Sequence, residues 1–336
     1  MVEDQLGRAL RDVRISVTDR CNFRCRYCMP RELFGPGHEF VERADLLSFE
    51  EITRLARVFA RLGARKLRLT GGEPLLRNGL EKLVEMLAEI DGIEDIALTT
   101  NASLLHARAQ RLHDAGLSRV TVSLDSLHPE RFAQISDTRV PLDRVLQGIA
   151  TAREVGLAPV KINSVVKKGV NDDEDIVELA RFGREHGDII RFIEYMDVGD
   201  SNGWRLDDVV RAREIVDKIH EQWPVEAADP NYTGEVAERY RYLDGAGEVG
   251  VIASVSQPFC STCTRTRLSP QGELVTCLFA TGGHDLRSIV RSDASDDELE
   301  QEIRGIWRAR TDRYSELRTE ETRRNRPKIE MSYIGG

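Results

Sequence analysis

The chain has 336 residues, six of them cysteines, and a formal net charge of −9 at pH 7. This length suggests two domains, although α/β barrels often form one domain of that size, and it is enough to bury a large core. A hydrophobic fraction of 40% and a charged fraction of 31% are typical of soluble globular proteins. The acidic balance argues against sequence-independent binding of nucleic acid, which needs a basic surface. No apolar run reaches the roughly 18 residues of a membrane span, and the N-terminus does not resemble a secretory signal, so we expect a cytoplasmic protein.

Strand-like and helix-like segments alternate over the first part of the chain. The predicted strands are residues 13–17, 66–70, 94–99, 119–124, 160–166 and 189–195. The predicted helices between them are residues 48–62, 80–90, 104–115, 142–155 and 173–186. The first helix begins with a capping box, Ser48 to Glu51, and ends at Gly63.

This alternation predicts an α/β fold of parallel strands joined by right-handed crossovers. Six periods fall short of the eight of a closed barrel, so the pattern leaves a partial barrel and a doubly wound sheet open. After about residue 200 this alternation ends. The predicted elements there are a helix at 210–222, a hairpin of strands 239–243 and 249–254, and a capped helix at 295–310. We therefore expect two domains, residues 1–200 and 201–336.

The six cysteines form two groups of three, with none left over. The groups are Cys21, Cys25 and Cys28, followed by Cys260, Cys263 and Cys277. A group of three cannot pair internally without leaving an odd thiol, and disulfide scaffolds are usually shorter and secreted. Clustered cysteines in a cytosolic chain more often bind a metal, so metal binding is the first functional expectation.

The first group follows the first predicted strand, in the segment Cys21-Asn22-Phe23-Arg24-Cys25-Arg26-Tyr27-Cys28. A structural zinc site normally takes four ligands, and the nearest fourth candidate, His38, lies beyond a Gly-Pro-Gly segment. A four-iron cluster normally takes four cysteines, so three thiolates would leave one iron open for a ligand. The spacing, with an aromatic residue before the third cysteine, resembles the signature of the radical S-adenosylmethionine (SAM) superfamily, in which the open iron chelates SAM.

The motif Gly71-Gly72-Glu73-Pro74 follows the second predicted strand. By itself it is compatible with an ordinary turn, but glycines also let a backbone approach a ligand closely. Members of the superfamily carry this motif against the amino group of SAM, so the two motifs support each other. Ligand contacts in parallel-sheet folds gather at the carboxyl ends of strands, which is where Ser123 and Met196 lie.

The second group lies in Cys260-Ser261-Thr262-Cys263-Thr264-Arg265-Thr266-Arg267, with Cys277 beyond it. One interpretation is a zinc knuckle with His284 as the fourth ligand, and the other is a second cluster with an open iron. Guanidinium groups are permanently charged and bind phosphates in a bidentate manner. Arg265 and Arg267 therefore favour a small anionic substrate beside this group.

Together, these motifs are similar to those of the GTP 3′,8-cyclases of molybdenum-cofactor biosynthesis, over essentially the whole chain. The similar segments are residues 14–25, 69–74, 191–194, 259–265 and 333–336. The resemblance implies a partial (β/α)6 TIM-type barrel of parallel strands, closed by a C-terminal region. It also implies SAM and two [4Fe-4S] clusters as cofactors, one cluster on each cysteine group, with the open iron of the second facing the guanine.

The resemblance further implies roles for individual residues. The expected SAM contacts are Tyr27, Gly72, Ser123 and Met196. The expected GTP contacts are Arg14, Arg68, Thr99, Lys161, Arg265, Thr266 and Arg267, with Lys66 and Arg191 as further candidates for the triphosphate. The expected catalytic residues are Arg14 and the tail glycines Gly335 and Gly336, since the tail enters the active site in this family. The chain departs from the family pattern at Ala102, where glycine is expected.

The implied reaction cleaves SAM to methionine and 5′-deoxyadenosine, removes the 3′ hydrogen of the GTP ribose and joins that carbon to carbon 8 of guanine. The product, (8S)-3′,8-cyclo-7,8-dihydroguanosine 5′-triphosphate, is the first intermediate of molybdopterin biosynthesis. The implied partners are GTP and an external electron donor; a homodimer is left open, and neither membrane nor nucleic acid is expected. The alternatives are a radical SAM peptide maturase with an auxiliary cluster, whose domains typically carry more cysteines, and a non-catalytic zinc or iron–sulfur module.

Overall fold

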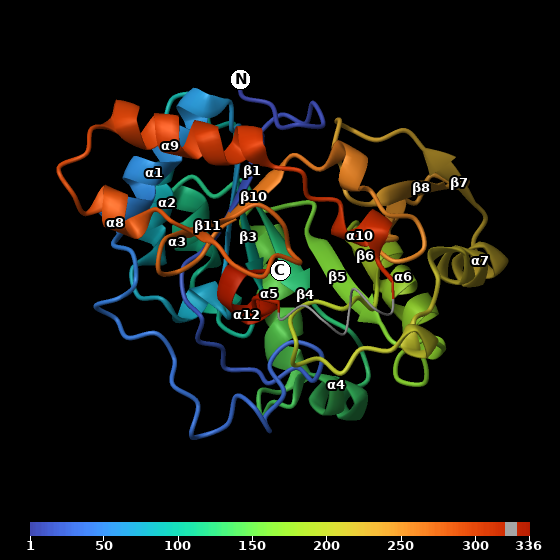
Figure 1. Ribbon diagram of the computed structural model, residues 1–336. Helices are drawn as coiled ribbons and strands as arrows, with labels where there is room; N and C mark the ends of the chain where they lie inside the picture. Colours follow the sequence, from blue (N-terminus) through green and yellow to red (C-terminus); the bar gives the residue numbers. More distant parts are fainter. Residues whose placement is uncertain (320–327) are drawn as a thin grey trace.

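The computed structural model describes residues 1–319 and 328–336 and contains one curved sheet with most helices on its outer side (Figure 1). The strands are β1 (Asp12–Ser16), β2 (Lys66–Thr70), β3 (Asp95–Thr100), β4 (Arg119–Ser123), β5 (Lys161–Val166), β6 (Ile189–Glu194), β7 (Val225–Ala228), β8 (Glu238–Tyr242), β9 (Glu248–Ile252), β10 (Arg265–Leu268), β11 (Glu273–Val275) and β12 (His284–Asp285). The α-helices are α1 (Phe49–Leu62), α2 (Leu80–Ala88), α3 (Ala109–Asp114), α4 (Pro129–Ser136), α5 (Leu142–Glu154), α6 (Glu174–His186), α7 (Ala212–Gln222), α8 (Arg287–Val290), α9 (Asp296–Ala309), α10 (Tyr314–Leu317) and α12 (Met331–Ile334). The short 3-10 turns are η1 (Pro74–Leu76), η2 (Leu105–Ala107), η3 (Leu206–Asp208) and η4 (Cys260–Thr262).

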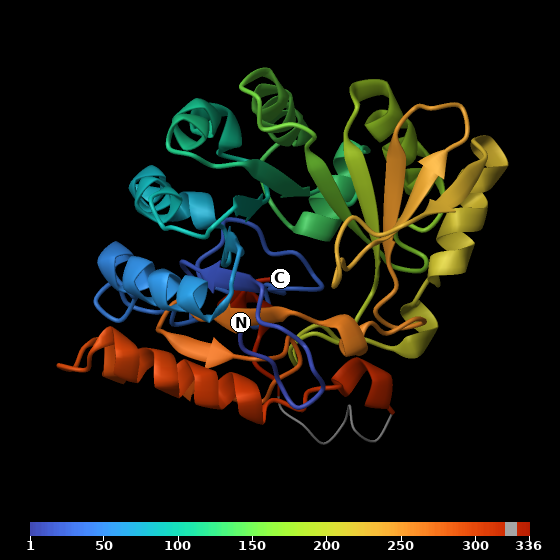
Figure 2. The same cartoon turned by 90° about the horizontal axis from the view of Figure 1, so that it is seen from above.

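The strand order confirms the partial barrel. Strands β1 to β6 lie side by side in chain order and are parallel, within the sheet β12-β11-β10-β1-β2-β3-β4-β5-β6-β9-β8-β7. The C-terminal region extends both edges of this array, because β10 pairs in parallel with β1 and β9 pairs in parallel with β6. The described strands leave the sheet open at β12 and β7, and Figure 2 shows the helices around the outside of the curve with the C-terminus near its centre.

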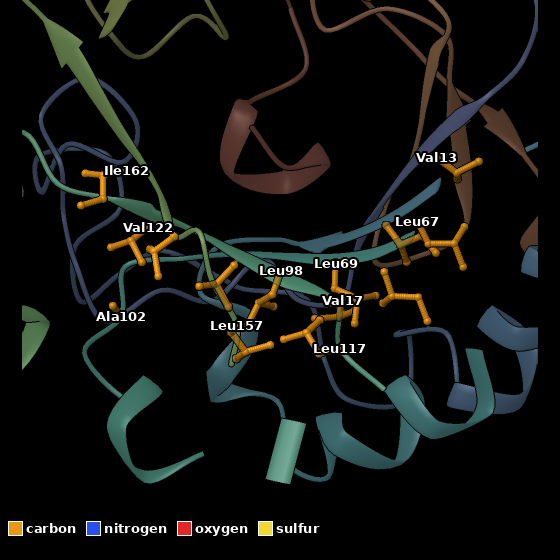
Figure 3. Close-up of a cluster of buried hydrophobic side chains, with 14 of the residues drawn as sticks. Val13, Val17, Leu67, Leu69, Leu98, Ala102, Leu117, Val122, Leu157 and Ile162 are labelled. Atoms are coloured by element: carbon orange, nitrogen blue, oxygen red, sulfur yellow. The ribbon is translucent and has the colours of Figure 1, made fainter. Parts of the chain in front are cut away.

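Alternation along the strands separates an apolar outer face from a polar inner face. In β1, Val13 and Ile15 are fully buried and alternate with Asp12, Arg14 and Ser16. The outer side chains of neighbouring strands form one cluster between the sheet and the helices, and Figure 3 labels Val13, Leu67, Leu69, Leu98 and Val122 within it. Burying each such side chain contributes about 1.5–3 kcal/mol, so this face fixes the register of the strands and leaves the other face for ligands.

The predicted helix boundaries agree well where capping residues are present. Ser48 Oγ accepts a hydrogen bond from the Glu51 amide at 3.1 Å, and the Glu51 carboxylate accepts one from the Ser48 amide at 2.7 Å. Gly63 ends α1 in the left-handed conformation, with φ of 115°. The capping box of α9 at Ser295 and the hairpin of β8 and β9 are confirmed as well.

Other elements differ from the sequence-based expectation. The predicted helix at 104–115 is interrupted between η2 and α3, where Arg108 has φ of −124° and its guanidinium donates to the Arg77 carbonyl at 3.1 Å. Helix α4 was missed, although Pro129 at its first turn is a recognised start signal. β10 was missed because its Arg-Thr-Arg-Leu sequence is too short and polar to stand out. Within the described residues, no helix combines the length and the apolar composition needed to cross a bilayer.

Candidate active site

One cavity on the inner side of the sheet brings the two cysteine groups together. All six cysteines line it, and each is a free thiol. The first group lies in the loop after β1, whereas Cys260 and Cys263 precede β10 and Cys277 follows β11. Because β10 and β11 are antiparallel, the start of β10 lies beside the end of β11. Cys260 and Cys263 therefore lie at the same end of this strand pair as Cys277. The sheet therefore assembles a group that is dispersed in the sequence.

Burial dominates the surroundings of the first group. It raises the pKa of Cys21 to about 11 and the pKa values of Cys25 and Cys28 well above the usual value for a thiol. The amide of Phe23 donates to Cys21 Sγ at 3.4 Å, and Asn101 Nδ2 lies 3.9 Å from the same sulfur. Buried thiols of this kind become thiolates only when a cation binds, which is the state in which cysteine ligates iron.

The Gly-Gly-Glu-Pro motif holds the end of β2 against the cysteine loop. A Cβ at Gly72 would lie 2.4 Å from the Arg20 carbonyl oxygen, and one at Gly71, whose φ is 148°, would lie 2.3 Å from the Thr18 carbonyl oxygen. Only glycine therefore fits either position. Glu73 is buried, its carboxylate accepts hydrogen bonds from the Asn101 amide at 2.7 Å and the Thr100 hydroxyl at 2.8 Å, and burial raises its pKa to about 7.

The expected SAM contacts come from four different elements and all line the cavity. They are Tyr27, Gly72, Ser123 and Met196. The Tyr27 hydroxyl donates to Asp125 Oδ2 at 2.8 Å, and the Val165 amide donates to Asp125 Oδ1 at 2.8 Å. Burial raises the pKa of Asp125 to about 6. Asp125 was not among the expected contacts, although it lies only two residues after Ser123, the last residue of β4.

Arginines surround the second cysteine group. Arg265 Nη2 and Arg310 Nη2 each lie 3.3 Å from Cys263 Sγ. Burial would raise the pKa of Cys263, but the positive charges of these two arginines outweigh it and lower that pKa to about 6. Cys277 has a pKa of about 11, raised mainly by burial. Arg310 was missed because it is distant in sequence from Cys263 and follows the last residue of α9, where the capping pattern gave no sign of a site.

The cysteines fit clusters better than single metal ions. In residues 1–319 and 328–336, no three side chains of His, Cys, Asp or Glu converge closely enough to hold one metal ion. His284, the candidate fourth zinc ligand, is exposed on β12. A four-iron cluster takes each thiolate on a different iron and so accepts wider spacing. The donor set of three free thiols per group matches such a cluster with one open iron.

Three arginines lie side by side across the inner face of the sheet between these groups. The register aligns Arg14 with Arg267 on one side and with Arg68 on the other. Burial lowers the pKa of all three, and the value for Arg267 falls to about 10. The Nε atoms of Arg14 and Arg68 are buried without a hydrogen-bond partner among the described residues. Three adjacent cations with two unpartnered buried donors are unfavourable without a counter-charge, so this row is suited to an anionic ligand.

A carboxylate that the sequence analysis did not select lies next to this row. Asp12 is aligned with Arg265 and with Lys66, whose Nζ lies 4.0 Å from Asp12 Oδ2. Burial alone would raise the pKa of Asp12, but Arg14, Lys66 and further cations lower it below its usual value. Burial lowers the pKa of Lys66 to about 7. The alternation Asp12-Val13-Arg14, on the strand directly paired with the one that carries Arg265, was the available signal.

The expected GTP contacts divide into those that reach the cavity and those that do not. The residues that line it are Arg14, Arg68, Thr99, Arg265 and Arg267, together with Lys66 and Arg191. Thr266 alternates with the two arginines of β10, and its hydroxyl donates to the Val275 carbonyl at 3.1 Å. Lys161, at the start of β5, is outside the lining, and burial together with Arg191 lowers its pKa to about 8.

The C-terminal tail reaches the same cavity. Gly336 is part of its lining, and the Gly335 carbonyl accepts a hydrogen bond from Arg267 Nε at 3.2 Å. Gly335 has φ of 75°, and a Cβ there would lie 2.2 Å from Thr70 Cγ2. Only glycine fits this position without strain. Ala102, by contrast, adopts φ of 60° as a non-glycine residue, so the expected glycine corresponds to a left-handed backbone.

Comparisons with known proteins identify the family to which the chain belongs. Residues 15–183 match the Radical SAM superfamily, and residues 188–316 match the family Molybdenum Cofactor Synthesis C. A GTP 3′,8-cyclase from Acidothermus cellulolyticus is 56% identical over 359 aligned positions, covering 100% of this chain and 99% of the relative. One from Staphylococcus carnosus is 50% identical over 338 positions, with the same coverage.

A solved structure shows the same fold at low sequence identity. SuiB of Streptococcus suis, bound to S-adenosylmethionine, has a TM-score of 0.60 and 17% identity and covers 88% of this chain and 68% of its own. The full-length identity and the two matched families lead to one conclusion. The chain belongs to the GTP 3′,8-cyclase family of the radical SAM superfamily.

Proposed function

We propose that this protein converts GTP to (8S)-3′,8-cyclo-7,8-dihydroguanosine 5′-triphosphate, the first step of molybdenum-cofactor biosynthesis. The observation that carries the proposal is the row Arg267–Arg14–Arg68, which lies between two three-cysteine groups in one cavity. A triphosphate would supply partners for the Nε atoms of Arg14 and Arg68, which are buried without one among the described residues. The full-length relatives named GTP 3′,8-cyclase support the same reaction.

Cys21, Cys25 and Cys28 would hold the first cluster, and its open iron would hold SAM. When bound, these groups supply the one-electron chemistry that removes a hydrogen atom from the substrate, and that hydrogen leaves in 5′-deoxyadenosine. Gly72 lines the cavity at the end of β2, where its backbone would contact SAM. Tyr27 and Asp125 lie beside the cysteine loop, and the 2.8 Å hydrogen bond between them fixes the Tyr27 side chain.

Cys260, Cys263 and Cys277 would hold the second cluster, which we propose orients the guanine. Arg265 and Arg310 stabilise the Cys263 thiolate, as the pKa of about 6 indicates. Arg14, Arg68, Arg267 and the further candidates Lys66 and Arg191 neutralise the triphosphate. Thr99, which accepts a hydrogen bond from Arg68 Nη1 at 3.1 Å, fixes that guanidinium. Lys161 and Thr266 remain predicted contacts from outside the cavity lining.

Further predictions concern the tail, the partners and the organisation of the chain. Gly335 and Gly336 contribute to catalysis by closing the cavity beside Arg267. An external electron donor reduces the clusters, because the cyclisation consumes electrons that neither SAM nor GTP provides. We also propose a cytoplasmic protein with regions 1–200 and 201–336, without nucleic-acid or membrane partners, and leave a homodimer open.

One anaerobic preparation tests this function. After cluster reconstitution and reduction, iron and acid-labile sulfide are measured together with the conversion of GTP in the presence of SAM. The expected result is two four-iron clusters per chain and equal amounts of 5′-deoxyadenosine and cyclised nucleotide. Release of 5′-deoxyadenosine while GTP stays intact would assign a different substrate, and bound zinc without sulfide would overturn the enzyme assignment.

A further inference from the structure

A buried ionic cluster lies outside the cavity lining, where the end of the chain meets the loop after β6. Lys328 Nζ donates to Asp197 Oδ2 at 2.7 Å and to the Asp197 carbonyl at 2.7 Å. The Tyr314 hydroxyl donates to the same carboxylate oxygen at 2.6 Å, and Arg318 Nε lies 2.9 Å from Asp197 Oδ1. The side chains of Lys328 and Asp197 are only 2% and 3% exposed, so neither charge is solvated by bulk water.

Aromatic rings connect this cluster to the second cysteine group. Phe279 and Tyr314 are stacked with their centroids 4.7 Å apart, and Lys328 Nζ lies 5.6 Å and 4.8 Å from the two ring centroids. The Phe279 amide donates to Cys277 Sγ at 3.5 Å. Lys328 therefore touches the segment that carries a cysteine of the proposed second cluster.

Backbone hydrogen bonds hold the chain on both sides of this lysine. The Lys328 amide donates to Asp200 Oδ2 at 3.0 Å, and the Ile329 amide donates to the Ala280 carbonyl at 3.0 Å. The Glu330 carboxylate accepts a hydrogen bond from the Asp200 amide at 3.1 Å. From there, one turn of helix, α12, leads to Gly335 and then to Gly336 in the cavity lining.

A buried ion pair specifies position more than it adds stability. Desolvation of the two charges offsets much of their attraction, but moving the lysine elsewhere would leave a buried charge without a partner. Lys328 can therefore occupy this place only while Asp197 is its partner, and the chain end can shift in register only if that pair breaks.

We propose that Asp197 and Lys328 form a latch that positions the C-terminal tail in the active-site cavity. Asp197 directly follows Met196, an expected SAM contact, and the rings that contact Lys328 adjoin Cys277. The latch therefore fixes the position of the tail relative to both the SAM end of the cavity and the second cysteine group. This inference rests on the proposed function, in which the tail takes part in catalysis. Asp197 and Lys328 are positioning residues, since neither lines the cavity.

The test compares four variants in the reconstituted holoprotein. Lys328→Met and Asp197→Asn each remove one charge while keeping a similar side-chain volume. Lys328→Arg keeps the positive charge. The double variant Asp197→Asn/Lys328→Met completes a double-mutant cycle. Lys218→Met is the matched control, because Lys218 pairs with Asp173 at 3.3 Å on the surface and Asp173 is 94% exposed. Amide hydrogen exchange of residues 331–336 is followed by mass spectrometry without GTP, and turnover of GTP is measured separately.

Each single charge removal is expected to speed tail exchange and to lower kcat by about tenfold or more, since a smaller fraction of molecules holds the tail in place. The KM for GTP should change much less than kcat. Lys328→Arg is expected to recover most of both properties, and the double variant should be no worse than the more severe single one because the two residues act as a unit. Lys218→Met should match the wild type.

Unchanged tail exchange in Lys328→Met and Asp197→Asn would overturn the latch. If Asp197→Asn does not fold, Lys328→Met decides the question alone, because its site lies close to the chain end. A wild-type protein that does not consume GTP would refute the proposed function, whereas the exchange comparison would still decide whether the latch exists.

Discussion

The two cysteine groups have the same number of thiols, but the surroundings of Cys263 in the second group shift its pKa in the opposite direction to those of the first group. Burial raises the pKa of Cys21 to about 11 in the first group, whereas Arg265 and Arg310 lower that of Cys263 to about 6 in the second. The first group lies against glycines and hydrogen-bonded side chains that suit a cationic sulfonium ligand. The second adjoins the arginine row that suits a polyphosphate. The two groups share a ligand count, so we propose that the surrounding charge distinguishes their tasks.

The largest effects are expected when one cysteine is removed from each group, because each substitution should abolish a different task. Cys25→Ser should abolish SAM cleavage, because the first cluster loses a ligand and the open iron is lost with it. Cys263→Ser should retain SAM binding but lose GTP conversion. Both are measured as 5′-deoxyadenosine and cyclised nucleotide from the same reaction. If Cys25→Ser still cleaves SAM, the two tasks have been assigned wrongly.

The pKa difference predicts selective alkylation of the protein without clusters. At pH 7, Cys263 should react with iodoacetamide about 100-fold or more faster than Cys21, because only a thiolate is nucleophilic. The reaction at Cys263 should slow as the pH falls below about 6, where its thiolate is protonated. Mass spectrometry of the labelled peptides measures both rates. Equal labelling rates at Cys21 and Cys263 would contradict the predicted difference in thiol pKa between them.

The arginine row predicts a loss of substrate affinity without loss of SAM binding. Arg14→Ala should weaken GTP binding by about 10- to 150-fold, which corresponds to about 1.5–3 kcal/mol for a hydrogen bond to a charged group. Isothermal titration with GTP and with SAM gives the two affinities. Arg213→Ala is the control, because the Arg213 side chain is 88% exposed. Equal weakening of SAM binding would show that Arg14 does not distinguish the two ends of the cavity.

The tail is predicted to tolerate no side chain at its penultimate position. Gly335→Ala combines φ of 75° with a Cβ 2.2 Å from Thr70 Cγ2. Strain of about 1–3 kcal/mol should lower turnover by about 5- to 150-fold. Gly282→Ala provides the control, because a Cβ there meets no atom within 4 Å. Turnover is measured at saturating GTP and SAM, and equal activity of the two variants would contradict a role for the tail.

The smallest expected effect concerns Ala102, next to the Asn101 that contacts the first cysteine group. Ala102→Gly should raise the free energy of unfolding by about 0.5–1 kcal/mol, because glycine adopts φ of 60° without steric strain. Chemical denaturation measures the change, and turnover should stay at the wild-type level. A destabilised variant would show that the buried methyl group packs well enough to outweigh the strain.

Local signals in the sequence were sufficient for much of the fold. The strands β1 to β6, the capped helices α1 and α9 and the hairpin of β8 and β9 were all predicted, because apolar periodicity and capping residues act over a few neighbouring residues. Helix α4 and the break at Arg108 were not predicted. The first depended on a start signal that was overlooked, and the second on a hydrogen bond to a distant carbonyl at Arg77.

The sequence by itself determined the cysteine groups, the strand–helix rhythm and the family resemblance, since these depend on residue identity and spacing. Only the tertiary structure decided that β10 pairs with β1, which aligns Arg267, Arg14 and Arg68 and brings Arg310 to Cys263. It also separated Arg265 and Arg267 from Thr266, which lies outside the cavity lining, and placed Lys328 on Asp197. The physical reason is that these arrangements join segments up to several hundred residues apart through hydrogen bonds and buried charges, which no local pattern encodes.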